Sequence, residues 1–330
     1  MPSRHDHYPR ADAGRRRAMR AAASRLADEW AAVDSAPDGL LAAMRAASAL
    51  APADAVAALA PWQDDPRWLA ARLSRALALL CADPFARPPL RPVGGGALGG
   101  LLLAEAGAIR LTLLVGPREA RGQGTAALFA PGCTRTRILA GGGADIAFHR
   151  AGVSAGEEGG AFTAAGAARC ETGPPRPLRT GEAFVLDGAR RAFTLSGGDG
   201  DILMLELAVQ PPTPLPTRAY DIASGRLTHV SASRRDSSFR GMALTLLRTM
   251  RRTDAAPLFA AEAATGDFAA RWHAARELAA LDPAAAHPVL ARMAAADPHP
   301  EVRQAAAAAL ALYPTPPLQR RGSETRQLAG

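Results

Sequence analysis

The chain has 330 residues, of which 48% are hydrophobic, so it is long enough for about two domains and apolar enough to bury a core. Its formal net charge is +8, and all 39 basic residues are arginine because the sequence contains no lysine. Three widely spaced cysteines, Cys81, Cys133 and Cys170, argue against a disulfide framework and a structural zinc site, and are typical of a reducing compartment.

Residues 11–87 are predicted to be helical, because apolar residues recur every three or four positions. The repeating positions are Met19, Ala22, Ala23, Leu26 and Trp30, and then Leu40, Leu41, Met44 and Ala47. A last helix is expected to begin near Asp65 and to end at Asp83-Pro84. We expect residues 1–10 to be disordered, and the Pro- and Gly-rich residues 88–97 to form a linker.

Residues 98–235 change in character to short apolar runs separated by Gly and Pro. Short strands at this spacing predict an antiparallel sandwich or barrel. The expected strands cover residues 101–103, 109–115, 125–129, 136–139, 145–149, 183–186, 192–195 and 202–209, with two more at 218–222 and 227–231.

The segment from Leu178 to Leu195 contains a Gly181-Glu182 turn, a strand, and a second tight turn at Gly188. This segment resembles the second conserved motif of the cupin family. The resemblance implies a small jelly-roll barrel over about residues 98–218. Metal-binding cupins carry a histidine after that second turn, where this chain has Arg190 and Arg191, and the HxH of their first motif is missing from residues 126–139. We therefore expect a barrel without a metal or another cofactor.

Six residues of this block are candidates for binding a small anionic ligand: Arg135, Arg137, His149, Glu182, Arg190 and Arg191. Strand alternation is expected to point one arginine of each pair inward, where a guanidinium can hold a carboxylate or phosphate with two hydrogen bonds. The alternative is that these arginines lie at strand ends and face solvent. No GxSxG motif and no cysteine-histidine pair is present, so we predict no catalytic residue.

The C-terminal region begins with a helix expected over residues 239–252, followed by a two-helix pattern. Asp297-Pro298, Val302-Arg303 and the following alanines resemble HEAT repeats, and Arg271 to Leu278 echo the pattern about 32 residues earlier. The resemblance implies stacked α-hairpins over residues 236–313. Candidate residues for contact with a protein are Arg271, Trp272, Arg276 and Arg303. We expect the tail, residues 314–330, to be disordered.

The predicted fold class is α+β: a cupin-like antiparallel barrel, flanked by an N-terminal helical region and C-terminal HEAT-like hairpins. The leading hypothesis is a non-catalytic interaction or regulatory protein that binds a protein partner. One alternative is a small-molecule sensor or an enzyme that uses the barrel interior. Another is nucleic-acid binding through the arginine-rich helices. A polar N-terminus and the absence of an 18-residue apolar run predict a cytoplasmic chain without a membrane span, and a homodimer remains open.

Overall fold

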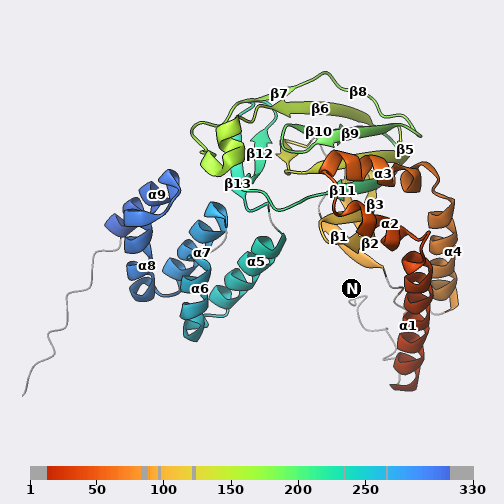
Figure 1. The fold of residues 1–330 in the computed structure, drawn as a ribbon, viewed down its shortest axis with the longest axis horizontal. Helices are drawn as coiled ribbons and strands as arrows, with labels where there is room; N and C mark the ends of the chain where they lie inside the picture. Colours follow the sequence, from red (N-terminus) through yellow and green to blue (C-terminus); the bar gives the residue numbers. More distant parts are fainter. Residues whose placement is uncertain are drawn as a thin grey trace, which may run out of the picture. The chain divides into compact units, whose positions relative to one another are not determined.

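A computed structural model describes residues 13–82, 88, 90–95, 98–120, 124–233, 235–264 and 267–312. The termini predicted to be disordered, residues 1–10 and 314–330, lie outside this range. The chain divides into two compact units (Figure 1). We call Met1–Val153, Ala167–Thr213 and Thr217–His229 the sheet unit, and Ser154–Gly166, Pro214–Pro216 and Val230–Gly330 the helical unit.

The sheet unit begins with helices, as the N-terminal apolar periodicity predicts. They are α1 (Ala13–Ser35), α2 (Leu40–Ala47), α3 (Pro52–Asp64) and α4 (Arg67–Ala82). Proline occupies the start of α3, where its missing N–H costs no helical hydrogen bond. Leu40, Met44, Val56 and Leu59 turn their apolar faces into one buried cluster. This cluster also contains strand residues, so the helices and a sheet share a core.

Six antiparallel strands form the sheet beneath these helices. In spatial order they are β1 (Arg91–Gly95), β2 (Leu98–Ala106), β3 (Ile109–Gly116), β11 (Ile202–Val209), β5 (Cys133–Ala140) and β9 (Ala183–Asp187). One face contributes Leu111, Leu113, Leu205 and Leu207 to the core shared with the helices. The expected linker is thus partly strand, because residues 91–95 pair with β2.

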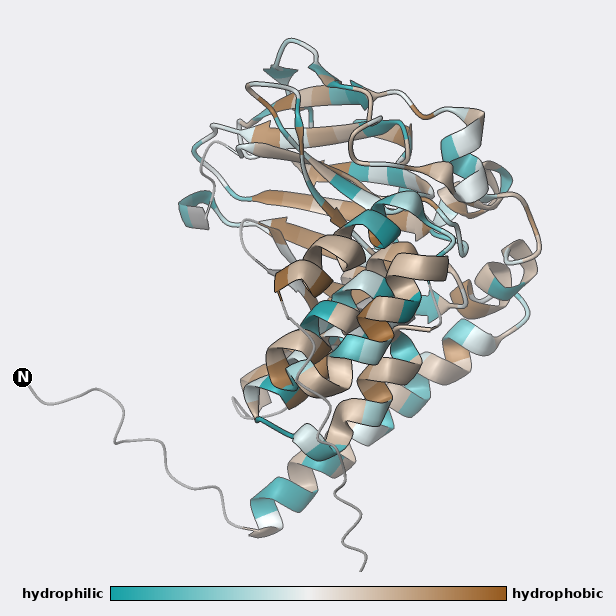
Figure 2. Ribbon diagram, turned by 90° about the vertical axis from the view of Figure 1, so that its left-hand side faces the viewer, coloured by the Kyte–Doolittle hydropathy of each residue, from teal (hydrophilic) through white to brown (hydrophobic). Residues whose placement is uncertain are grey.

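Two smaller sheets complete this unit. The second contains β10 (Arg191–Ser196), β6 (Asp145–Ala151), β7 (Cys170–Thr172) and β8 (Arg176–Pro177), and the third β13 (Leu227–Ser231), β12 (Thr217–Asp221) and β4 (Ala126–Phe129). Ile138 and Met204 of the six-stranded sheet pack with Ile146 and Phe193 of the second sheet. Figure 2 shows hydrophobic stretches running along these strands. The described sheets pack as a sandwich and do not close into a barrel, and the α+β class with antiparallel sheets and flanking helices is as predicted.

The second and third sheets also share a core on the side of β6 away from that sandwich. Ala151 and Ala192 pack there with Phe129 and Tyr220, whose rings meet edge to face at 5.2 Å. We call the space between the six-stranded and the second sheet the sandwich interior. Short helical turns at Arg118–Ala120, Glu157–Ala161 and Thr253–Ala255 complete the described elements.

The helical unit contains α5 (Arg235–Thr249), α6 (Ala256–Glu262), α7 (Phe268–Leu281), α8 (Pro283–Ala296) and α9 (Pro300–Leu312). Helix α7 packs against α5, α6 and α8, and α8 packs against α9. Asp267 and Asp282 cap α7 and α8 by accepting hydrogen bonds from Ala270 N and Ala285 N at 2.9 and 3.0 Å. Within the described part of the chain, no helix has both the length and the apolarity needed to cross a bilayer.

Candidate functional site

A polar row crosses the sandwich interior on the six-stranded sheet. Glu206 of β11 lies directly opposite Thr112 of β3 on one side and Thr136 of β5 on the other. Facing residues on neighbouring antiparallel strands have Cβ atoms about 5 Å apart, so Glu206 lies between the two threonines in this row. Leu114, Ile138 and Met204 lie on the same strand faces and belong to the apolar interior. The row therefore places an acid within an otherwise apolar layer.

Glu206 is electrostatically unusual. Burial raises the pKa of its carboxyl above the ordinary 4.5, although the positive charge of Arg110 opposes the shift. The hydroxyl of Thr136 is fully buried and has no hydrogen-bond partner among the described residues. A buried polar group without a partner is costly, so the Thr136 hydroxyl is an unfavourable feature of this layer.

An aromatic cluster adjoins the row. Phe184 of β9 lies opposite Thr136, and its ring meets those of Phe148 and Phe193 edge to face, each at 5.3 Å. The guanidinium groups of Arg176 and Arg191 lie 5.4 and 5.7 Å from the centre of the Phe148 ring. The second sheet thus supplies aromatic surface to this interior, and the two arginines that contact the Phe148 ring are exposed.

Arg190 lies in the turn before β10, and Arg191 is the first residue of that strand. Arg191 shares a strand face with Phe193, and its guanidinium lies over Phe148. Arg190 instead pairs with Asp187 at 3.0 Å in the turn before β10. Glu182 is bound by Arg176 at 3.0 Å, and this hydrogen bond is the main cause that lowers the pKa of the Glu182 carboxyl. Arg191 is exposed, and Arg190 and Glu182 are half-buried, so none of these three side chains is buried in the sandwich interior.

Arg135 and Arg137 do not point inward, and that expectation was wrong. The two residues are two positions apart on β5, so strand alternation places them on the same face. That face meets α3, where Asp64 Oδ1 lies 2.7 Å from Arg135 Nη2 and 3.0 Å from Arg137 Nη1. These arginines hold a helix against the sheet.

His149 lies on the opposite face of β6 from Phe148. Its Nδ1 is 3.0 Å from Thr172 Oγ1, and its Nε2 is 2.8 Å from Thr194 Oγ1. The side chain is 1% exposed, and burial lowers the pKa of the imidazole below the ordinary 6.5. No three His, Cys, Asp or Glu side chains of the described residues gather in a way that could hold a metal ion. Each ring nitrogen of His149 therefore has a threonine hydroxyl as its hydrogen-bond partner.

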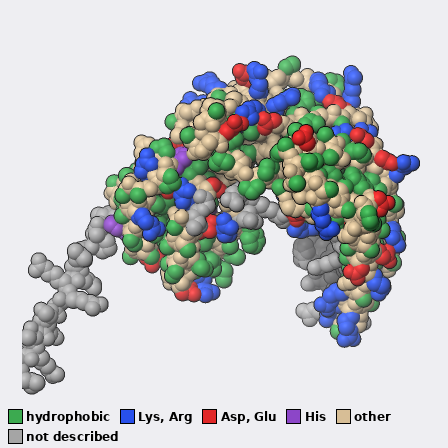
Figure 3. Space-filling view, viewed as in Figure 1, with side chains coloured by type: hydrophobic (Ala, Val, Ile, Leu, Met, Phe, Trp, Pro, Cys, Tyr) green, Lys and Arg blue, Asp and Glu red, His purple; other side chains and the backbone are tan. Residues whose placement is uncertain are grey.

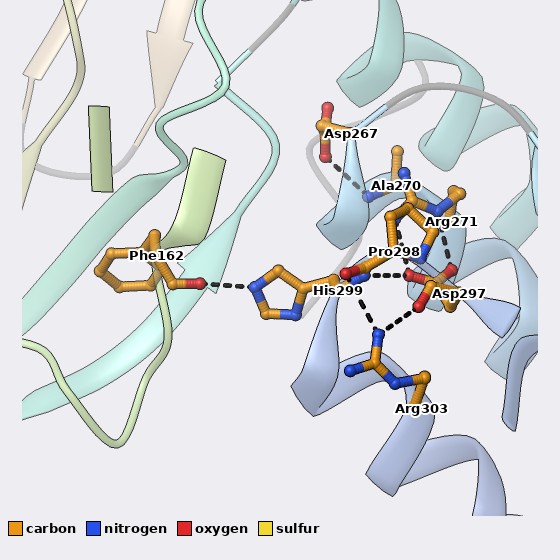
Figure 4. A network of polar contacts seen from close by, with 8 residues as sticks. All are labelled: Phe162, Asp267, Ala270, Arg271, Asp297, Pro298, His299 and Arg303. Carbon is orange, nitrogen blue, oxygen red and sulfur yellow. Dashed lines mark hydrogen bonds and ion pairs between the residues drawn. The ribbon is translucent and has the colours of Figure 1, made fainter. Parts of the chain in front are cut away.

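The helical unit contains a buried ion pair at the turn before α9 (Figure 4). Arg271 of α7 donates from Nε to Asp297 Oδ2 at 2.9 Å and from Nη2 to Asp297 Oδ1 at 2.8 Å. Arg303 of α9 donates from Nη1 to the carbonyl oxygens of Asp297 and Pro298, at 2.6 and 3.2 Å. Arg271 and Arg303, two of the four residues proposed to contact a protein, therefore hold the turn before α9 in place through hydrogen bonds within the repeat.

The segment Ser154–Gly166, which belongs to the same unit, forms hydrogen bonds with the turn before α9 and with the first turn of α9. His299 Nε2 is hydrogen-bonded to the Phe162 carbonyl (Figure 4). The His299 ring also stacks on that of Phe268, with ring centres 4.1 Å apart. The carboxylate of Glu301 accepts hydrogen bonds from Ala164 N and Ala165 N at 3.0 and 3.1 Å. Because Glu301 is in the first turn of α9, its charge also suits the helix dipole.

The other two candidates on α7 differ in exposure. Trp272 is half-buried against the core of the helical unit, whereas Arg276 is exposed. Neither residue forms part of the network around Asp297. Arg276 is thus available to a partner, while Trp272 contributes mainly to packing.

Helix α5 and Met250, which directly follows it, carry an exposed apolar surface that was not predicted from the sequence. Phe239, Met242, Leu246 and Met250 recur at intervals of three and four, and they are 57 to 68% exposed. Leu244 and Leu247, on the opposite side of the helix, pack into the core of the helical unit. Hydrophobic side chains are visible over this part of the surface in Figure 3. We call the four exposed residues the α5 stripe.

A family model for HEAT repeats matches residues 227–311, which confirms the repeat resemblance of the C-terminal region. The match covers α5 to α9 almost completely and begins in β13. No curated protein matches the chain.

Similar solved structures cover a little over a third of this chain. Hydroxypropylphosphonic acid epoxidase from S. wedmorenis is 12% identical, over 36% of this chain and 55% of its own, with a TM-score of 0.25. Ectoine synthase from P. lautus is 13% identical over 37% and 71%, with a TM-score of 0.23. A putative mannose-6-phosphate isomerase from Ralstonia eutropha is 13% identical over 36% and 91%, with a TM-score of 0.23. All three are cupin-fold proteins. The chain spans about half the length of the epoxidase.

Proposed function

We propose that this chain is a non-catalytic accessory or regulatory protein whose helical unit binds another protein through the α5 stripe. The observation that carries the proposal is the exposure of four large apolar side chains on one face of α5. Contiguous apolar surface of this kind marks interaction sites on soluble proteins. Stacked helical repeats present such surfaces along their outer helices.

The charged residues near the α5 stripe indicate what kind of surface a partner would need. Arg240 and Arg248 on the same helix are engaged by Glu262 and Glu277, at 2.9 and 2.6 Å, so their charges are balanced within the unit. The stripe therefore offers mainly apolar contacts, with Met242 and Met250 able to adapt their shape. An apolar groove or the apolar face of an amphipathic helix suits this surface. We propose that the interaction takes place in the cytoplasm, because Cys81, Cys133 and Cys170 are all free thiols.

The proposal is tested with a tagged full-length chain used to isolate partners from its native lysate after nuclease treatment, with mass spectrometry to identify them. Leu246→Glu places a charge in the centre of the stripe. Leu258→Glu is the matched control, because Leu258 is 59% exposed on α6 and lies outside the stripe. A near-stoichiometric protein that is lost with Leu246→Glu and kept with Leu258→Glu supports the proposal.

The size of the effect follows from interface energetics. A central apolar anchor contributes about 2 kcal/mol or more to binding, so affinity should fall roughly 30-fold or more with Leu246→Glu. A partner that both variants retain equally would overturn the role of the stripe. A lysate that yields no near-stoichiometric protein would overturn the docking function itself.

As a second candidate, we propose that the sandwich interior binds a small organic ligand. The specific observation is Glu206, with its raised pKa, beside the unpartnered hydroxyl of Thr136. Native mass spectrometry of the purified full-length chain tests this by detecting a retained small molecule. Thr136→Val removes the hydroxyl at nearly constant shape and should release such a molecule. Equal retention by the variant would contradict the role of the row.

A further inference from the structure

A cavity of about 470 Å³ lies among the N-terminal helices of the sheet unit. Its volume is within the range of ordinary small-molecule sites. Three of the four tryptophans of the chain line it: Trp30 of α1, Trp62 of α3 and Trp68 of α4. All three are half-buried, so each keeps some surface that solvent can reach. Neither the cupin-like sandwich nor the HEAT-like repeat accounts for this aromatic cluster.

The cavity lining contains four ionisable residues, and the charges of three of them are balanced. Arg72 forms an ion pair with Asp34, and both side chains are almost completely buried. Arg75 pairs at 2.7 Å with Glu29, which lies outside the lining. Asp38 is exposed and has no hydrogen-bond or ion-pair partner among the described residues. The described lining therefore carries one uncompensated charge, and that charge is negative.

A tight turn between α1 and α2 holds Asp38 at the cavity. The turn is closed by a hydrogen bond from Gly39 N to the Ala36 carbonyl at 2.8 Å. Gly39 also packs so closely on the end of α1 that a Cβ there would collide with the carbonyl oxygens of Val33 and Asp34. Ala36, Asp38 and Gly39 all line the cavity. The Asp38 carboxylate is therefore anchored at the exposed rim, within reach of a ligand in the cavity.

The indole rings of the wall are already ordered. Trp68 Nε1 donates a hydrogen bond to the Trp62 carbonyl at 2.8 Å, and the two rings meet edge to face at 5.9 Å. The Arg72 guanidinium lies 5.1 Å from the ring centre of Trp30 and 5.2 Å from that of Trp68. Indole rings attract cations more strongly than other aromatic side chains, and here two of them already stabilise one. Walls that are fixed before binding lose little side-chain entropy when a ligand binds.

We propose that this cavity binds an organic cation with an aromatic body, whose ammonium group lies at Asp38. The tryptophan rings supply apolar contact for the body, and the carboxylate at the rim selects the ammonium. The chain as a whole has a net charge of +8, which repels cations, so a preference for a cation has to come from this local carboxylate. All the residues involved belong to the sheet unit, so the inference is independent of the α5 stripe.

Three naphthalene derivatives of similar shape separate the body of the ligand from its charge. Naphthylmethylamine is protonated at neutral pH, naphthylmethanol is uncharged, and naphthoic acid is a carboxylate. Isothermal titration calorimetry of the purified full-length chain, at neutral pH and physiological salt, gives the affinity of each. Because Asp38 is exposed, it contributes as a surface ion pair does, and we expect the amine to bind about three- to fivefold more tightly than the alcohol. The acid should bind most weakly of the three.

Two aspartate variants test the source of the preference. Asp38→Asn should bind the amine and the alcohol equally, and its affinity for the alcohol should match that of the wild type. Asp54→Asn is the matched control, because Asp54 is also exposed but lies in the first turn of α3, about 12 Å along that helix from Trp62. That distance exceeds the screening length at physiological salt, so Asp54→Asn should keep the preference for the amine.

Two exposed alanines of α4 test the position of the site. Ala71 lines the cavity and the adjacent Ala70 does not, so a phenylalanine at either position adds bulk at the surface, but only Ala71→Phe adds it to the cavity. Ala71→Phe should weaken binding of the amine about tenfold or more, and Ala70→Phe should leave it unchanged.

Each result that contradicts the proposal has a distinct meaning. Equal affinity of the wild type for the amine and the alcohol would overturn the selection of a cation, and tighter binding of naphthoic acid would show that Arg75 governs the site instead. Loss of the preference in both aspartate variants would overturn the role of Asp38. Equal amine affinity of the two alanine variants, or no binding of the amine by the wild type, would overturn the site itself.

Discussion

Gln63 and Arg135 exchange hydrogen bonds in both directions between α3 and the six-stranded sheet. Gln63 Nε2 donates to the Arg135 carbonyl at 2.9 Å, and Arg135 Nη1 donates to Gln63 Oε1, also at 2.9 Å. Gln63 Nε2 also donates to the Leu205 carbonyl at 2.7 Å. One amide therefore joins a helix to two adjacent strands at a fully buried position.

Gln63→Leu should destabilise the chain by about 2 kcal/mol, because it leaves two buried carbonyls and a guanidinium with fewer partners. Asp64→Asn is the control: Asp64 pairs with Arg135 and Arg137 but is about half exposed, so its loss should cost at most about 1 kcal/mol. Urea unfolding of both variants measures the difference. Equal costs would show that the buried amide has no special role.

Arg271→Met should destabilise the helical unit by about 3 to 5 kcal/mol, since it leaves the buried carboxylate of Asp297 without its cation. Arg276→Met, on the same helix but exposed, should change the free energy of unfolding by less than about 0.5 kcal/mol. Thermal unfolding followed by circular dichroism makes this comparison. A similar melting temperature for the two variants would contradict a structural role for the ion pair.

The Asp297 carboxyl also makes stability depend on pH. Burial alone would raise its pKa, but hydrogen bonds from Arg271 and from His299 N outweigh burial, and the pKa falls below the ordinary 3.8. The ionised Asp297 carboxyl therefore contributes fully to the free energy of unfolding above pH 3.8. This contribution is lost as the pH falls through the lower pKa of the folded chain. Asp297→Asn should show a smaller loss of stability in acid than the wild type, measured by urea unfolding across the acidic range.

His149 should destabilise the fold in mild acid. Because burial lowers its pKa below 6.5, the unfolded chain binds a proton more readily than the folded chain, and stability falls as the pH drops below 6.5. His149→Gln should remove this part of the pH dependence. His229→Gln, at an exposed position, should keep the wild-type profile. Urea midpoints recorded across this pH range would contradict the prediction if both variants behaved alike.

Glu206 and Glu182 should respond to amide replacement with opposite signs. The pKa of Glu206 is raised by burial, so ionisation disfavours the fold as the pH rises above 4.5, and Glu206→Gln should be more stable than the wild type at neutral pH. The pKa of Glu182 is lowered by its hydrogen bond with Arg176, so Glu182→Gln should be less stable than the wild type above 4.5. Denaturant unfolding at neutral pH gives both signs. Destabilisation by Glu206→Gln would contradict a buried, disfavoured carboxylate.

All ten strands expected from the sequence are present, because local apolar runs and Gly-rich turns specify them. Strands β1, β7 and β8 were not predicted, because they lack such local signals. Residues 91–95 contain proline and glycine, and they become a strand only by pairing with β2, which is not a local property. Strands β7 and β8 have three and two residues, too few to show alternation.

The candidate site was harder to predict than the fold. Glu206 is the only charged residue in the apolar run Ile202–Val209, and that contrast was the available signal. Its importance depends on Thr112 and Thr136, which are distant in sequence and adjacent only through strand register. Arg135 and Arg137 show the opposite case, because their spacing alone was enough to place them on one strand face. The exposure of the α5 stripe depended on which side of the helix packs, which periodicity alone does not specify.

The segment Ser154–Gly166 has a consequence for synthesis on the ribosome. It lies between β6 and β7 in the sequence but belongs to the helical unit, where its partner His299 is 137 positions further along the chain. At about 5 to 20 residues per second, roughly 7 to 27 seconds pass between the emergence of Phe162 and that of His299. During that interval the segment has no turn to dock on, so the nascent chain exposes Phe162 until the last helix is made. A fragment that begins at Val230 would lack this segment permanently, and genetic dissection of the two units must therefore carry residues 154–166 with the helices.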